Sequence, residues 1–100
     1  MLMHLPIVMF AYLSLTPVAD NVPTFDIARE CKSESDTAAA QERCAGDEAQ
    51  ARDQLLPLWQ QSSAADRAVC VKETSMDGTP SYVELLTCLE MARDVKRRPK

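Results

Sequence analysis

Histidine is almost absent from this chain. The single histidine among the 100 residues is His4, inside a segment without Lys, Arg, Asp or Glu through residue 19. A chain that has lost this segment has no imidazole to serve as a general base, as the partner of a nucleophile or as a metal ligand. The scarcity excludes the commonest hydrolytic mechanisms, and we expect that the protein is not an enzyme.

Glycine and strand-forming patterns are scarce as well. Gly46 and Gly78 are the two glycines, which excludes a glycine-rich loop for phosphate binding. No alternating run of β-branched residues follows residue 20, so we expect no strands. These absences favour an all-α fold that holds no cofactor.

The N-terminal segment is apolar and uncharged. Leu5–Leu15 is an apolar run of 11 residues, and charged residues begin at Asp20. The run is shorter than the roughly 20 residues of a membrane-spanning helix. We predict a signal peptide over residues 1–19 with cleavage near Ala19, although its first residues lack the usual Lys or Arg; an uncleaved anchor or a misassigned start is the alternative. Residues 20–100 then form a single domain of a periplasmic or secreted protein.

The charge of this domain is uneven. Residues 20–92 carry 14 acidic and 6 basic side chains, whereas residues 93–100 carry 5 basic and 1 acidic. The acidic body argues against nucleic acid as a partner, because neutralising phosphates requires a basic surface. It favours a basic protein partner. The basic C-terminal tail predicts weak contact with anionic lipid headgroups or with the acidic body itself, so that membrane contact is limited to the signal segment and this tail.

Four cysteines remain after residue 19: Cys31, Cys44, Cys70 and Cys88. An even number in a short exported chain indicates disulfides, and four cysteines allow three pairings. Cys31 and Cys44 flank a turn predicted at residues 33–36, and Cys70 and Cys88 flank a turn predicted at Asp77-Gly78. We therefore favour the two local pairs, which suit antiparallel helical hairpins. The crossed pairing of Cys31 with Cys88 and Cys44 with Cys70 stays open. No Cys-x-x-Cys motif or close ligand pair is present, so we expect neither a redox-active pair nor a metal site.

Residues 81–95 form the clearest amphipathic helix in the sequence. The Ser81-x-x-Glu84 spacing predicts a capping box, followed by an apolar stripe. The stripe comprises Tyr82, Leu85, Leu86, Leu89 and Ala92. Earlier helices are predicted over residues 25–32, from about residue 37 to residue 56, and over 64–74, with Leu58 and Trp59 continuing the apolar surface past Pro57. The predicted fold is therefore an all-α bundle of three to four helices, built as helical hairpins stapled by two disulfides.

The sequence also predicts which residues cap the helices, where a helix is interrupted and which side chains face the core. Ser35 or Asp36 is expected to cap the second helix, and Ser63 the third. Pro57 is expected to kink or break the second helix. The third helix is expected to pack through a thin stripe, and acidic side chains are expected to be solvated rather than catalytic. The stripe comprises Ala65, Ala68 and Val69. The acidic residues are Asp47, Glu48, Asp53, Glu84 and Glu90. Glu48 is also expected to pair with Arg52, four residues later on the same helix.

Two resemblances extend this interpretation. The motifs FDI-x-R-x-C at Phe25, E-x-x-AR-x-x-L at Glu48, DR-x-x-C at Asp66 and SYVELLTCLEMA at Ser81 resemble a family of short secreted four-cysteine helical bacterial proteins. This likeness implies export and the cysteine framework. A weaker likeness, to lysozyme-inhibitor-like secreted proteins, implies binding of a basic enzyme. The residues that carry it are Cys31, Cys44, Trp59, Arg67, Cys70, Cys88, Leu89 and Arg93.

The sequence predicts a non-enzymatic exported protein that binds a partner, of lysozyme-inhibitor-like type if the weaker resemblance holds. The alternative is a structural or envelope-associated protein that uses its basic tail. No catalytic, cofactor-binding or metal-binding residues are expected, and the cysteines are expected to be structural.

Overall fold

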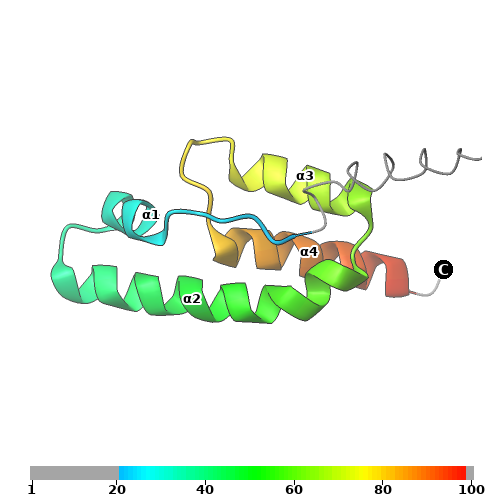
Figure 1. Ribbon diagram of the computed structural model, residues 1–100, viewed down its shortest axis with the longest axis horizontal. Helices are drawn as coiled ribbons and strands as arrows, with labels where there is room; N and C mark the ends of the chain where they lie inside the picture. The colour runs from blue at the N-terminus through cyan, green and yellow to red at the C-terminus, as the bar shows by residue number, and fades with distance from the viewer. Residues whose placement is uncertain (1–20, 99–100) are drawn as a thin grey trace, which may run out of the picture.

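The computed structural model describes residues 21–98, so the predicted signal peptide lies outside the described residues. Within this part of the chain there are four helices and no strand, as the sequence predicted. Their bounds are Ile27–Glu34 (α1), Ala38–Gln61 (α2), Ala64–Thr74 (α3) and Tyr82–Arg97 (α4). Figure 1 shows α4 lying between the long α2 and the shorter α3, with α1 folded back at the start of α2. The helices pack as α1 on α2, α2 on α4 and α3 on α4.

The core lies chiefly between α2 and α4. Its buried members are Ala51, Leu55, Leu58, Trp59, Cys70, Tyr82, Leu85, Leu86 and Leu89, with Val22, Phe25, Ile27, Val71 and Cys88 packed against them. The predicted stripe of α4 is therefore confirmed from Tyr82 to Leu89, while Ala92 is half-buried. Burying one leucine stabilises a fold by about 1.5–3 kcal/mol, so this one face dominates the packing energy of α4.

Each helix begins at a side chain that accepts a bond from the first turn. Asp26, Thr37, Ser63 and Ser81 occupy the N-cap positions. The prediction for Ser63 is confirmed. The cap of α2 was predicted wrongly, because Thr37 Oγ1 accepts from the Ala40 N–H at 3.2 Å while Ser35 Oγ accepts from the Thr37 N–H. A threonine side chain at the cap competes well with a preceding serine or aspartate when its backbone is already extended.

Pro57 does not break α2, so one of the two expected outcomes is wrong, while the expected kink stays a prediction. The helix runs through Pro57 to Gln61. A proline inside a helix costs about 3 kcal/mol. Leu58 and Trp59, which follow it, are both buried, whereas Pro57 itself is exposed. The burial of these two large side chains offsets the lost backbone bond, so tertiary packing overrides the local preference.

The face of α3 that packs was also predicted wrongly. Ala65, Ala68 and Val69 are exposed. The buried residues of α3 are Cys70 and Thr74. The reason is that the disulfide from Cys70 to α4 turns that side of α3 towards the bundle, leaving the small apolar residues on the outer side.

The turn between α3 and α4 follows the predicted Asp-Gly signal. Gly78 has a φ of 86°, in the left-handed region that favours glycine. Asp77 Oδ1 accepts bonds from the backbone N–H and the hydroxyl of Thr79 at 3.0 and 3.2 Å. These bonds hold the pKa of Asp77 below its usual value. The turn therefore brings Ser81 back beside the end of α3.

Two disulfides staple the hairpins. Cys31 bonds to Cys44 and Cys70 bonds to Cys88, each with Cα atoms 5.6 Å apart. Loops of this length contribute roughly 3 kcal/mol each in the loop-entropy model. Two such bonds indicate an oxidising, extracytoplasmic environment. Among the described residues, no helix has the length and apolar character needed to cross a bilayer.

Candidate functional site

A groove separates the extended N-terminal segment, residues 21–24, from α3. Its volume is about 670 Å³. The walls come from that segment, from the end of α2 and from one side of α3. The lining residues are Asn21, Val22, Pro23, Thr24, Trp59, Ala64, Arg67, Ala68, Val71, Lys72 and Ser75. The groove is therefore mainly apolar, with the cationic side chains of Arg67 and Lys72 among its lining residues.

Tyr82 holds the outer wall of the groove in place. Its hydroxyl accepts a bond from the Phe25 N–H and donates one to the Pro23 carbonyl, both at 2.8 Å. The rings of Phe25 and Tyr82 have centroids 4.7 Å apart. This aromatic contact and the two bonds fix an irregular segment against α4, so the groove has a defined outer wall.

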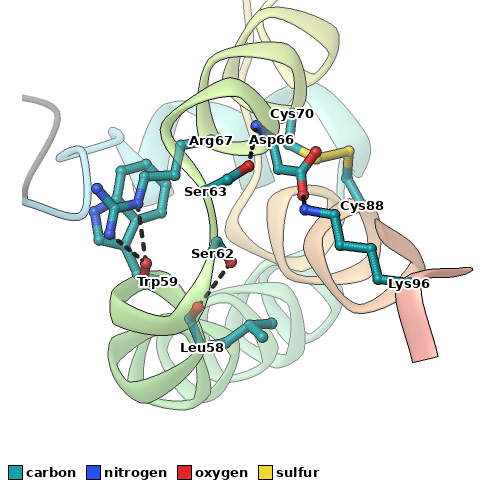
Figure 2. Close-up of polar contacts among 9 residues, drawn as sticks. All are labelled: Leu58, Trp59, Ser62, Ser63, Asp66, Arg67, Cys70, Cys88 and Lys96. Atoms are coloured by element: carbon teal, nitrogen blue, oxygen red, sulfur yellow. Dashed lines mark hydrogen bonds and ion pairs between the residues drawn. A yellow bond between two sulfur atoms is a disulfide. The ribbon is translucent and has the colours of Figure 1, made fainter. Parts of the chain in front are cut away.

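Trp59 and Arg67 form the floor of the groove at the corner between α2 and α3. Nε and Nη2 of Arg67 both donate to the Trp59 carbonyl, at 2.9 and 2.7 Å. The guanidinium lies 5.1 Å from the centroid of the Trp59 ring (Figure 2). This carbonyl lies at the end of α2 and also accepts from the Ser62 N–H at 3.2 Å. Arg67 therefore adds to the capping of this helix end and stacks on the ring.

The same corner carries an ion pair on its other side. Lys96 Nζ donates to Asp66 Oδ2 at 2.6 Å, linking the end of α4 to the start of α3 (Figure 2). The hydrogen bond and charge of Lys96 hold the pKa of Asp66 below its usual value. The predicted contact of the basic tail with acidic residues thus exists for Lys96, while Arg97 and Arg98 are exposed.

Glu48 is not solvated, contrary to expectation. It is 3% exposed, and its carboxylate lies at the start of α4. Oε2 accepts from the Ser81 hydroxyl at 2.6 Å and Oε1 from the Tyr82 N–H at 2.6 Å, with the Val83 N–H at 3.4 Å from Oε2. A helix N-terminus leaves backbone donors unpaired and carries partial positive charge. Glu48 therefore caps α4 from α2 instead of pairing with Arg52.

The predicted capping box of α4 is also altered. Ser81 Oγ accepts from the Glu84 N–H at 3.2 Å, as expected. Glu84 does not return the bond directly, because Thr74 stands between the two residues. Thr74 Oγ1 accepts from the Ser81 N–H at 2.9 Å and donates to Glu84 Oε1 at 2.8 Å. The end of α3 and the start of α4 are thus joined through one buried hydroxyl.

Glu30 is the second buried carboxyl group, and it lies against a disulfide. It is 6% exposed, and Oε1 is 3.5 Å from the Sγ atoms of both Cys31 and Cys44. Burial, followed by the negative charges of Glu48, Glu34 and Glu84, raises the pKa of Glu30 to about 7. Glu30, Cys31 and Cys44 also have ligand atoms within 4.8 Å of one another. Both sulfurs are bonded to each other, so this cluster does not present thiolates to a metal.

The other acidic residues singled out from the sequence do not gather into one site. Asp47 and Asp53 are exposed on α2, and Glu90 is half-buried on α4. No protein-family model, curated protein or solved structure matches this chain. The resemblances to secreted four-cysteine proteins and to lysozyme inhibitors therefore stay predictions. The sequence signal for Glu48 was its place on the buried face of α2, three residues before Ala51 and seven before Leu55.

Proposed function

We propose that this protein is a non-enzymatic binding protein, secreted or periplasmic, that takes an amphiphilic ligand with an apolar chain and an anionic head. The observation that supports the proposal is the groove beside α3. Its size, about 670 Å³, falls within the range of small-molecule pockets. Its outer wall is held by Tyr82 and its floor by the Trp59–Arg67 contact.

The composition of the groove favours this class of ligand. Val22, Ala68 and Val71 offer apolar surface, which gains free energy when it leaves water. Lys72 adds an exposed cation at the edge, where it can attract an anionic head while the chain lies along α3. A basic protein partner is less well matched to this surface, and that partner stays a prediction from the acidic composition.

The single tryptophan makes the proposal directly testable. Trp59 lines the groove and is the one tryptophan of the chain, so its fluorescence reports occupancy. Disulfide-bonded protein from an oxidising compartment is titrated with a long-chain fatty acid, and the emission of Trp59 is followed. We expect saturable binding that weakens at high salt, since Lys72 contributes through its charge.

Two substitutions on α3 provide a matched pair. Ala68→Glu places a carboxylate in the groove, whereas Ala65→Glu places one on α3 outside it, and both positions are exposed. We expect Ala68→Glu to weaken binding by at least about tenfold, through loss of apolar contact and charge repulsion, and Ala65→Glu to leave it unchanged. Equal effects of the two variants, or no change in Trp59 emission with the wild-type protein, would contradict the proposal.

A further inference from the structure

The Cys31–Cys44 disulfide has a carboxyl group in contact with both of its sulfur atoms. Glu30 Oε1 is 3.5 Å from each Sγ. A disulfide sulfur carries no hydrogen, so any proton shared in this contact belongs to the carboxyl group. Glu30 is 6% exposed, which favours its neutral, protonated form. The buried acid is therefore placed to donate a proton to either sulfur.

The charged groups around Glu30 come from three helices. Glu34 lies on α1 itself, Glu48 faces Glu30 from α2, and Glu84 faces it from α4; all three oppose its ionisation. Asp26 and Arg29 share a cavity of about 140 Å³ with Glu30, beside the turn at residues 78–80. This environment raises the pKa of Glu30 to about 7. The carboxyl group therefore exchanges its proton near neutral pH.

The two cysteines of this bond differ in exposure. Cys31 is 2% exposed, whereas Cys44 is half-buried. An incoming thiolate therefore reaches the sulfur of Cys44, and the sulfur of Cys31 becomes the leaving group. That leaving group lies beside Glu30, where a proton is needed as negative charge develops.

We propose that the Cys31–Cys44 disulfide is a thiol–disulfide exchange site for dithiols, in which Glu30 protonates the Cys31 sulfur as it leaves. The absence of a Cys-x-x-Cys motif argued for a purely structural pair. The contact with Glu30 supplies what the motif would otherwise provide, a means of stabilising the leaving thiol. This inference is independent of ligand binding in the groove beside α3.

The exchange proceeds in two balanced steps. One thiolate of the dithiol attacks Cys44 Sγ, the Cys31–Cys44 bond breaks, and Cys31 leaves with the electron pair and takes the proton of Glu30. The second thiol of the dithiol, once deprotonated, attacks the other sulfur of the dithiol, which is bonded to Cys44 in the mixed disulfide. Cys44 leaves as a thiolate, which water protonates. The dithiol is oxidised to a disulfide and the protein disulfide is reduced to two thiols; Glu30 regains its proton from water.

The second disulfide is an internal control. Glu73 Oε1 lies 3.7 Å from Cys88 Sγ, but Glu73 is exposed. Cys70 is buried and Cys88 is half-buried, so access to the Cys70–Cys88 bond resembles access to the first. The two bonds then differ mainly in the burial of the adjacent glutamate.

The test compares reduction rates of the two bonds within one protein. The folded protein is treated with dithiothreitol between about pH 5.5 and about pH 8.5, free thiols are alkylated at intervals, and peptide mapping gives each rate. The ratio of the Cys31–Cys44 rate to the Cys70–Cys88 rate cancels the ionisation of the reductant. We expect this ratio to fall by about tenfold or more as pH rises through about 7, because Glu30 loses its proton and then repels thiolates. A ratio that does not change with pH would overturn the proposal.

Glu30→Gln separates proton donation from charge repulsion. Glutamine has nearly the same shape but no acidic proton. With proton donation, the wild-type Cys31–Cys44 bond is reduced faster than that of Glu30→Gln below about pH 6 and more slowly above about pH 8. Charge repulsion alone gives a variant that is never slower than wild type, and that result would also overturn the proposal.

Two further variants complete the design. Glu73→Gln should leave the pH dependence of the rate ratio unchanged, since Glu73 is exposed. The ratio itself can shift by a constant factor, because the variant removes a carboxyl group 3.7 Å from Cys88 Sγ. Glu34→Gln removes a neighbour that raises the pKa of Glu30, so the midpoint of the wild-type profile should move to lower pH. An unmoved midpoint would count against Glu30 as the titrating group, whether or not Glu30→Gln folds normally.

Discussion

Glu48 and Glu30 are both buried carboxyl groups of the α1–α2 hairpin, yet their surroundings are opposite. Glu48 lies at the N-terminus of α4 and accepts bonds from the Ser81 hydroxyl and the Tyr82 N–H. Glu30 lies at a disulfide with further carboxylates around it. Burial alone disfavours a charged carboxylate, so the difference comes from what faces each group. Hydrogen-bond donors at a helix start face Glu48, while burial and other acids oppose the ionisation of Glu30.

The largest expected effect comes from removing Glu48. Glu48→Ala leaves the Ser81 hydroxyl and the Tyr82 N–H buried without their acceptor, which costs about 2–4 kcal/mol of unfolding free energy. Urea unfolding followed by circular dichroism measures this loss. Asp47→Ala, at the exposed neighbouring position, is the control and should change stability by less than about 0.5 kcal/mol. Equal losses from the two variants would mean that Glu48 does not cap α4.

The next effect is a pH dependence that belongs to Glu30. Its pKa is raised in the folded state from 4.5 to about 7, so the folded protein binds the proton more tightly than the unfolded chain. The stabilisation from this tighter proton binding is therefore fully present below about pH 4.5. It is lost as pH rises to about 7, which lowers the free energy of unfolding by about 1–3 kcal/mol. Urea midpoints across this pH range measure it, and Glu30→Gln should remove the slope. A slope that persists in Glu30→Gln would assign it to other groups.

A smaller effect is expected at Thr74, which supports the α4 start next to Glu48. Thr74→Val keeps the shape but removes the hydroxyl that accepts from the Ser81 N–H and donates to Glu84. We expect a loss of about 1–2 kcal/mol in unfolding free energy. Thr87→Val is the matched control, because the Thr87 hydroxyl is exposed and bonds only its own helix at Val83. If Thr87→Val loses as much unfolding free energy as Thr74→Val, the loss at Thr74 does not come from the hydrogen bonds of its hydroxyl to Ser81 and Glu84.

The smallest effect is expected at Asp66, a half-buried carboxylate in an ion pair at the surface. Lys96→Gln removes the partner of Asp66, and exposed ion pairs contribute little to stability. The unfolding midpoint should stay within error of wild type, while the pKa of Asp66, followed by NMR, should rise towards its usual value. A clear loss of stability would mean that this surface ion pair contributes to the free energy of unfolding on the scale of a buried carboxylate such as Glu48.

The sequence was sufficient for the parts of the fold that depend on local signals. The stripe of α4, the Ser63 cap, the Asp77-Gly78 turn and the pairing of cysteines at similar distances from a turn all lie within a hairpin. The expected break at Pro57 was wrong because continuation of the helix is decided by the burial of Leu58 and Trp59. These contacts form between helices, and no local sequence pattern indicates them.

The candidate sites were harder to predict for the same reason. Glu48 lies on the buried face of α2, but it was expected to be solvated because its acceptor role needs the start of α4, 33 residues later. The proximity of Glu30 to Cys44 needs the α1–α2 turn to close. The groove beside α3 depends on which face of α3 the Cys70–Cys88 bond turns inwards, and the small stripe of α3 gave the wrong face.

The contact between Tyr82 and the N-terminal segment has a consequence for the order of folding. Phe25 bonds a residue 57 positions later, whereas Cys31 and Cys44 are separated by 13. Contacts that are close in sequence form early, because closing a short loop costs less entropy. The α1–α2 hairpin can therefore oxidise before α4 has been made, but residues 21–25 must wait for Tyr82. This segment precedes the four helices in the chain but is thus among the last parts to dock, and the groove that it walls is completed only when α4 has folded.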